Sequence, residues 1–140
     1  MQNKSFLNVA LILFLLSAFL AACGGPVNPK PGATFSGVIS MDKAKNARIT
    51  LQVSEDGQTI ESVNVAFTDL KCDGFSAGNT SSTIGTRTPI VNGKFEIKSS
   101  NIGAISGQFK SPTSVEGSIQ LAFFEGKTEC GTWEWSATGE

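Results

Sequence analysis

The sequence predicts an all-β fold: an antiparallel β-sandwich of seven to eight strands, with a small closed β-barrel as the alternative. From Phe35 onward, apolar and polar residues alternate with the period of two that is typical of half-buried strands. Turn-forming pairs such as Asp56-Gly57 and Asn92-Gly93 interrupt the alternation at short intervals. No stretch carries the apolar stripe of a helix. Sandwich and barrel require the same alternation, so the sequence leaves both open.

Each expected strand places its apolar residues on one face, because successive side chains of a strand point to opposite sides. Ile60 is out of register with the residues that follow it, which predicts a β-bulge near Ser62. The residues expected to face inward are, in chain order, Phe35, Gly37 and Ile39; Ile49, Leu51 and Val53; Val63, Val65 and Phe67; Phe95 and Ile97; Ile105, Gly107 and Phe109; Val115, Gly117, Ile119, Leu121 and Phe123; and Trp133, Trp135 and Ala137.

The middle of the chain has the weakest strand signal. The third strand is expected to run from Thr59 to Leu70. Residues 73–83 are rich in Gly, Ser, Thr and Asn, and this composition predicts a loop. A weak strand is expected from Thr86 to Val91.

The first 22 residues have the pattern of a cleaved signal peptide. A short polar start containing Lys4 precedes an apolar run from Phe6 to Leu20, which is shorter than the ~20 residues that span a bilayer comfortably. The tetrapeptide Leu20-Ala21-Ala22-Cys23 follows directly and resembles the lipobox of bacterial lipoproteins. The alternatives are an ordinary secretory leader and an uncleaved membrane helix.

The lipobox resemblance implies that Cys23 receives lipid and becomes the first residue after cleavage. Two or three acyl chains make such an anchor stable. The implied location is extracytoplasmic, on the cell membrane or the outer membrane. This interpretation divides the chain into three segments: the signal peptide (1–22), a lipidated Cys with a Pro/Gly-rich tether (23–34), and a single β domain (35–140).

Composition excludes several classes of function. The chain of 140 residues has no His, 11 Lys and Arg, and 12 Asp and Glu, and the charges alternate in sign along the chain. Without His, neither a Ser-His-Asp nor a Cys-His catalytic arrangement can form, and Cys/His zinc sites are excluded. Without a basic stripe, nucleic acid is not an expected partner. We expect no enzyme activity, no catalytic residues, no metal site and no cofactor.

Cys72 and Cys130 remain once Cys23 is assigned to lipid. An even pair of cysteines in an exported domain predicts a disulfide. The alternative is a redox-active pair, but catalytic pairs usually lie close together in sequence, as in Cys-x-x-Cys.

Three aromatic residues are candidates for a ligand site or an interface. Trp133 and Trp135 lie two apart and therefore share a face of the last strand, where they would either fill the core or form a platform for a sugar ring. The polar residues between and beside them favour the core. Phe124 is expected to point outward, because its neighbour Phe123 belongs to the inward set.

The segment from Ile105 to Ile119, together with Cys130-Gly-Thr-Trp-Glu-Trp-Ser-Ala137, is similar to a recurrent small β module of secreted bacterial proteins. The similarity extends over Ile49 to Ala137; it implies the fold and carries no activity. The expected function is a non-enzymatic module of the cell envelope that binds a protein or glycan, or assembles through a sheet edge or Phe124. The alternative is an enzyme inhibitor or small hydrolase acting through a loop at Asp73–Thr86.

Overall fold

The computed structural model describes residues 25–123 and 127–140, and every regular element in those two ranges is a β-strand. The predicted sites at Cys23 and Phe124 lie outside the described residues. The all-β class predicted from the sequence is confirmed. In chain order the strands are β1 (Thr34–Ile39), β2 (Lys45–Val53), β3 (Thr59–Thr68), β4 (Leu70–Cys72), β5 (Phe75–Ala77), β6 (Thr80–Pro89), β7 (Lys94–Ser99), β8 (Gly103–Ser111), β9 (Ser114–Phe123) and β10 (Thr128–Gly139).

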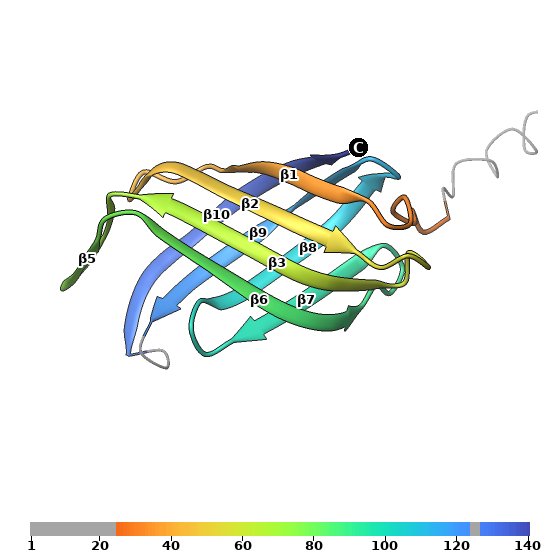
Figure 1. Cartoon of the computed structure of the whole chain (residues 1–140). Coiled ribbons are helices and arrows are strands. Elements are labelled where there is room, and N and C mark those ends of the chain that lie inside the picture. The colour runs from red at the N-terminus through yellow and green to blue at the C-terminus, as the bar shows by residue number, and fades with distance from the viewer. Residues whose placement is uncertain (1–24, 124–126) are drawn as a thin grey trace, which may run out of the picture.

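Eight of the strands form one antiparallel sheet in the order β6-β3-β2-β1-β10-β9-β8-β7, and β4 and β5 pair separately as a short hairpin. The sheet curls until β1, β2, β3 and β6 face β7–β10, and the two layers are joined where β1 pairs with β10 (Figure 1). This nearly closed sheet combines both predicted arrangements. It has the two packed layers of a sandwich and the continuous ladder of a barrel.

Every predicted inward residue lies on the core side of its strand. All of them are buried except Gly37, Gly117, Phe123 and Trp133, which are half-buried. Aromatic rings connect the two layers: the ring of Phe35 on β1 meets that of Phe109 on β8 in an edge-on contact, with centroids 5.2 Å apart. Burying one such side chain contributes about 1.5–3 kcal/mol. Period-two alternation therefore located most of the core, but it missed buried residues such as Ala33, Ala47, Leu70 and Ile102.

Gly117 marks a place where the backbone must lack a side chain. It pairs with Trp135 on β10 and with Gly107 on β8. A Cβ atom at Gly117 would lie 2.7 Å from Trp135 Cζ2 and would overlap the carbonyl oxygen of Ser106. The indole of Trp135 can lie against β9 only because this position is glycine.

The bulge predicted near Ser62 is present. The register between β3 and β6 shifts between Ile60 and Ser62, and the register between β2 and β3 shifts between Gln52 and Val53. The extra residue lets Ile60 become fully buried although it is out of phase with Val63.

The predicted loop at residues 73–83 is wrong. Phe75–Ala77 forms β5, and β6 begins at Thr80 and continues to Pro89, so the weak strand expected from Thr86 is the second half of a longer one. Periodicity missed β6 because its inward residues Ser82, Thr86 and Thr88 are polar. The strand forms because β3 pairs with it along most of its length. The third strand ends at Thr68 rather than Leu70, because the backbone turns at Asp69 (φ 52°).

The described part of the predicted tether lies against the domain. The Lys30 amide donates to the carbonyl of Pro112 (2.8 Å), and the Gly32 amide donates to that of Ser54 (2.9 Å). Ala33 is buried, and Val27 packs against the core cluster. We call this end of the molecule the tether end, and the opposite end, which carries the β4–β5 hairpin, the disulfide end (Figure 1).

Candidate functional site

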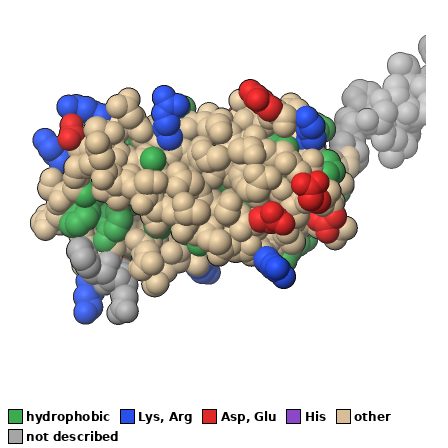
Figure 2. All heavy atoms as spheres, viewed as in Figure 1, with side chains coloured by type: hydrophobic (Ala, Val, Ile, Leu, Met, Phe, Trp, Pro, Cys, Tyr) green, Lys and Arg blue, Asp and Glu red, His purple; other side chains and the backbone are tan. Residues whose placement is uncertain are grey.

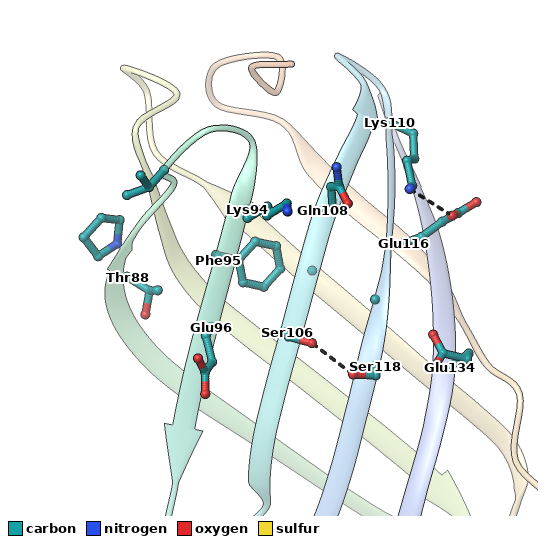
Figure 3. Close-up of a pocket in the computed structure, with 14 residues that line it drawn as sticks. Thr88, Lys94, Phe95, Glu96, Ser106, Gln108, Lys110, Glu116, Ser118 and Glu134 are labelled. Atoms are coloured by element: carbon teal, nitrogen blue, oxygen red, sulfur yellow. Dashed lines mark hydrogen bonds and ion pairs between the residues drawn. The ribbon is translucent and has the colours of Figure 1, made fainter. Parts of the chain in front are cut away.

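A groove of about 760 Å³ follows the outer surface of β7, β8, β9 and β10 (Figure 3). Its floor is made of short residues: Ser106 and Ser118 face each other across β8 and β9 with their hydroxyl oxygens 2.9 Å apart. Longer side chains, those of Glu96 on β7 and Glu134 on β10, flank this pair. The hollow therefore follows from the side-chain lengths in one row across the sheet.

The strand registers produce this row. Glu96 pairs with Ser106, Ser106 with Ser118, and Ser118 with Glu134. Neighbouring strands are about 4.8 Å apart, so the four residues span roughly 14 Å across the sheet. Such a strip of hydroxyls and carboxylates can hydrogen-bond a polar ligand.

Most charges in the groove are already paired. Lys98 lies 3.3 Å from Glu96, and Lys110 lies 3.8 Å from Glu116. Among the described residues, the carboxylate of Glu134 has no ion pair. These pairs are exposed, and each contributes little to stability. The groove therefore presents a nearly balanced polar surface.

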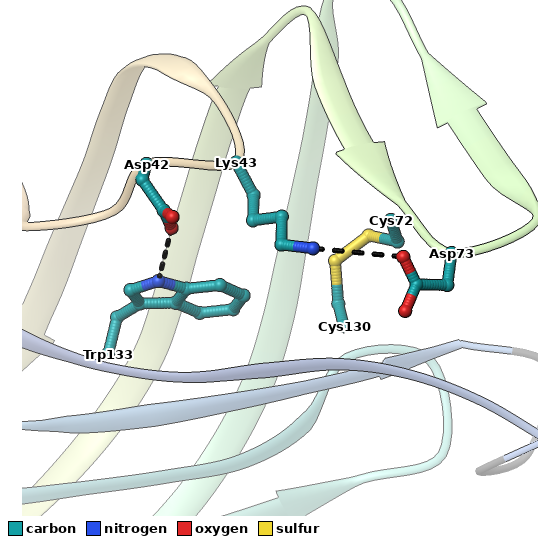
Figure 4. The surroundings of a disulfide bond; sticks show 6 residues. All are labelled: Asp42, Lys43, Cys72, Asp73, Cys130 and Trp133. Carbon is teal, nitrogen blue, oxygen red and sulfur yellow. Dashed lines mark hydrogen bonds and ion pairs between the residues drawn. A yellow bond between two sulfur atoms is a disulfide. The ribbon is translucent and has the colours of Figure 1, made fainter.

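The disulfide end is built around the predicted bond between Cys72 and Cys130 (Figure 4). The bond joins β4 to β10, with the two Cα atoms 5.0 Å apart and 58 residues between them in sequence. A second contact holds the hairpin against the sheet: the ring of Phe75 on β5 lies 5.0 Å from that of Phe123 on β9. The hairpin is thus fixed at two points across the end of the barrel.

Charged residues surround the disulfide. Lys43 lies 3.8 Å from Asp73, and Lys45 lies 3.0 Å from Asp69. The indole Nε1 of Trp133 donates a hydrogen bond of 3.2 Å to Asp42. Loops β1–β2 and β3–β4 meet here with β10, although they are distant in sequence. On the face shown in Figure 2, Lys and Arg side chains lie at both ends, whereas most of the acidic side chains lie toward the tether end.

The two tryptophans have different environments. Trp135 is 2% exposed and its ring lies 6.3 Å from that of Phe95, so it belongs to the core, as the flanking polar residues indicated. Its buried Nε1 has no hydrogen-bond partner among the described residues. Trp133 is half-buried beside the disulfide end and keeps its polar edge accessible to Asp42. Of the two predicted platform residues, only Trp133 reaches the surface.

Sequence reasoning missed the groove and the link between Trp133 and Asp42. A simple hairpin with its turn at Pro112-Thr113 would set Ser106 opposite Ile119, and only the register shift between Phe109 and Ser111 brings Ser106 opposite Ser118. Placing Glu134 in the same row requires the bulge between Glu129 and Gly131, which no turn residue indicates. The pair of Trp133 and Asp42 spans 91 residues and has no local signal.

No protein-family model and no curated protein sequence matches this chain. Within residues 25–123 and 127–140, no three or more Cys, Asp or Glu side chains are grouped so that they could hold a metal ion. The same residues contain no helix of the length and apolar character needed to cross a membrane.

Proposed function

We propose that the protein is a lipid-anchored, extracytoplasmic module of the cell envelope that binds a partner protein without catalysis. In this proposal, the lipid on Cys23 holds the tether end at the membrane and the disulfide end points away from it. The observation that carries the proposal is the separation of the two ends: the chain enters the fold at the end opposite Cys72–Cys130.

The tether end supports close attachment. Val27 lies against Gly93, with its carbonyl oxygen 2.6 Å from the position that a Cβ on Gly93 would occupy. Val27 is the fourth residue after Cys23, and even a fully extended chain of four residues spans at most roughly 14 Å. A lipid on Cys23 would therefore keep the tether end near the headgroups.

The disulfide end supports binding. Its loops are positioned by a rigid scaffold, because the hairpin is fixed by both the disulfide and the contact between Phe75 and Phe123. It presents a half-buried Trp133 among exposed charges such as Lys71 and Asp73. Tryptophan surrounded by polar residues is typical of the centre of a protein interface.

The anchor is tested by metabolic labelling with an alkyne fatty acid. The wild-type chain is expected to incorporate the label, and a Cys23→Ser variant is expected to lose it. A double variant of Cys72 and Cys130, each changed to Ser, is the matched control and should remain labelled. Labelling of Cys23→Ser at the wild-type level would refute the lipid assignment.

Binding is tested by affinity capture from intact envelopes. A variant with Lys43→Glu and Lys71→Glu reverses two charges at the disulfide end. The matched control, Lys94→Glu with Lys110→Glu, makes the same change in charge at the groove. Loss of capture is expected only in the first variant. Loss only in the second would assign binding to the groove, and equal capture by both would contradict the proposed surface.

A further inference from the structure

The two edges of the open sheet differ in how they are protected. β6 and β7 are the outer strands, and the turn that connects them is closed by the bridge between Val91 and Lys94. β7 carries Lys94, Glu96 and Lys98, and such charges discourage pairing with another chain. The other edge has no comparable protection along part of its length.

Protection of β6 is confined to the tether-end half. Arg87, Pro89 and the bulge opposite Ile60 and Ser62 all lie there. The half from Thr80 to Thr86 has the sequence Thr-Ser-Ser-Thr-Ile-Gly-Thr, which contains neither a charge nor a proline. One edge of this half pairs with β3, and no strand of residues 25–123 or 127–140 pairs with the other. Its free edge therefore presents unpaired main-chain donors and acceptors.

We infer that an extended segment of a partner protein adds as a strand to the free edge of β6 between Thr80 and Thr86. This inference rests on the proposed anchoring and specifies how the partner binds. Strand addition obtains its affinity from main-chain hydrogen bonds and its specificity from alternate side chains. Outward residues Ser81 and Thr83 and inward residues Ser82 and Ile84 are uncharged, so the complementary segment is an uncharged one.

The anchor geometry favours another protein over a second copy of this chain. Two copies of β6 paired antiparallel would be related by a two-fold axis perpendicular to the sheet. That rotation would direct the tether end of the second copy the opposite way. Two copies anchored in one membrane through Cys23 could not adopt this arrangement. The free half of β6 also lies toward the disulfide end, which the proposal places away from the membrane.

Photo-crosslinking in intact cells tests the strand geometry on the full chain. A photoreactive amino acid is placed in turn at Ser81, Thr83 and Gly85, with Ser36 in the middle of the sheet as control. An added antiparallel strand predicts adducts whose attachment points in the partner step backward by two residues as the probe moves forward by two. Adducts without this stepping, or adducts of equal yield from Ser36, would overturn the inference. An adduct between two copies of this chain would also overturn it.

Proline substitution supplies a test with its own control. The amides of Ser82 and Thr83 point to opposite edges of β6, because adjacent residues of a strand alternate in this respect. One of the variants Ser82→Pro and Thr83→Pro therefore removes a bond to β3 and lowers the melting temperature, and the other leaves it nearly unchanged. The variant that keeps its melting temperature is expected to capture the partner about tenfold less. If it captures normally while the Lys43→Glu and Lys71→Glu variant does not, strand addition is wrong and the proposed function stands.

Discussion

The two ends of this β domain are closed by different means. At the tether end, turns and the incoming chain are held by main-chain hydrogen bonds, such as those of Lys30 with Pro112 and of Gly139 with Thr113. At the disulfide end, the closure comes from Cys72–Cys130 and from side chains far apart in sequence. The comparison teaches that the tether end, where the proposed attachment lies, is held mainly by main-chain hydrogen bonds, whereas the disulfide end depends on individual side chains.

The largest predicted effect breaks the disulfide end. Changing Cys72 and Cys130 to Ser removes a constraint on a loop of 58 residues, which the chain-entropy model values at roughly 4 kcal/mol. The melting temperature measured by circular dichroism should fall on the order of 15 °C. Wild-type protein treated with a reductant should have the same melting temperature as the double variant. A wild type insensitive to reductant would contradict the role of this bond.

The next prediction concerns the middle of the sheet, where β8, β9 and β10 pack closely between the two ends. Gly117→Ala should lower the free energy of unfolding by about 1–3 kcal/mol, because its methyl group would collide with Ser106 and Trp135. Gly85→Ala is the control, since a Cβ there would meet no atom within 4 Å, and it should change stability by less than about 0.5 kcal/mol. Urea unfolding measures both. Equal effects of the two variants would show that the close packing at Gly117 is unimportant.

A smaller effect is expected at the surface of the disulfide end. Trp133→Phe keeps an aromatic ring packed against the core and removes the hydrogen bond to Asp42, so it should cost about 0.5–1.5 kcal/mol. Asp42→Ala should cost a similar amount, and the double variant should cost little more than either single one. Additive losses in this cycle, measured by urea unfolding, would show that the two side chains are not coupled.

The smallest effect is expected in the turn after β2. The Ser54 hydroxyl donates to Asp56 Oδ1 (2.6 Å) and the Gln58 amide donates to the same atom, and these bonds lower the pKa of Asp56. A lowered folded pKa stabilises the fold above the unfolded Asp pKa of about 3.9, and this stabilisation is lost as the pH falls through the folded pKa. When the pH is lowered from about 6 to about 2, the free energy of unfolding of the Asp56→Asn variant should therefore fall less than that of the wild type. Glu61→Gln, on an exposed position of β3, is the control and should follow the wild-type profile.

The sequence predicted the parts of this molecule that local chemistry determines. The alternation of apolar and polar residues located the inward faces of the strands. The pairs Asp56-Gly57 and Asn92-Gly93 located turns at the tether end. Ile60, which is out of phase with the apolar residues that follow it, located a bulge. These features depend on residues that are neighbours in the chain. Composition also sufficed to pair Cys72 with Cys130, because few alternatives remained.

What could not be predicted depends on contacts between distant segments. β6 was mistaken for a loop in its first half because Ser82 and Thr86 hide the alternation, and only pairing with β3 makes it a strand. The groove needs three strand registers to agree before Glu96, Ser106, Ser118 and Glu134 form one row. No single segment contains that information.

The orientation of the domain is tested most directly by energy transfer to the membrane. A donor fluorophore is attached to a cysteine introduced at Ser76 on β5 or at Thr113 in the β8–β9 turn, with an acceptor dye in the lipid. Because strands of this length separate the two ends by roughly 20–30 Å, transfer should be strong from position 113 and weak from position 76. Equal transfer from both positions, or stronger transfer from position 76, would contradict attachment through the tether end.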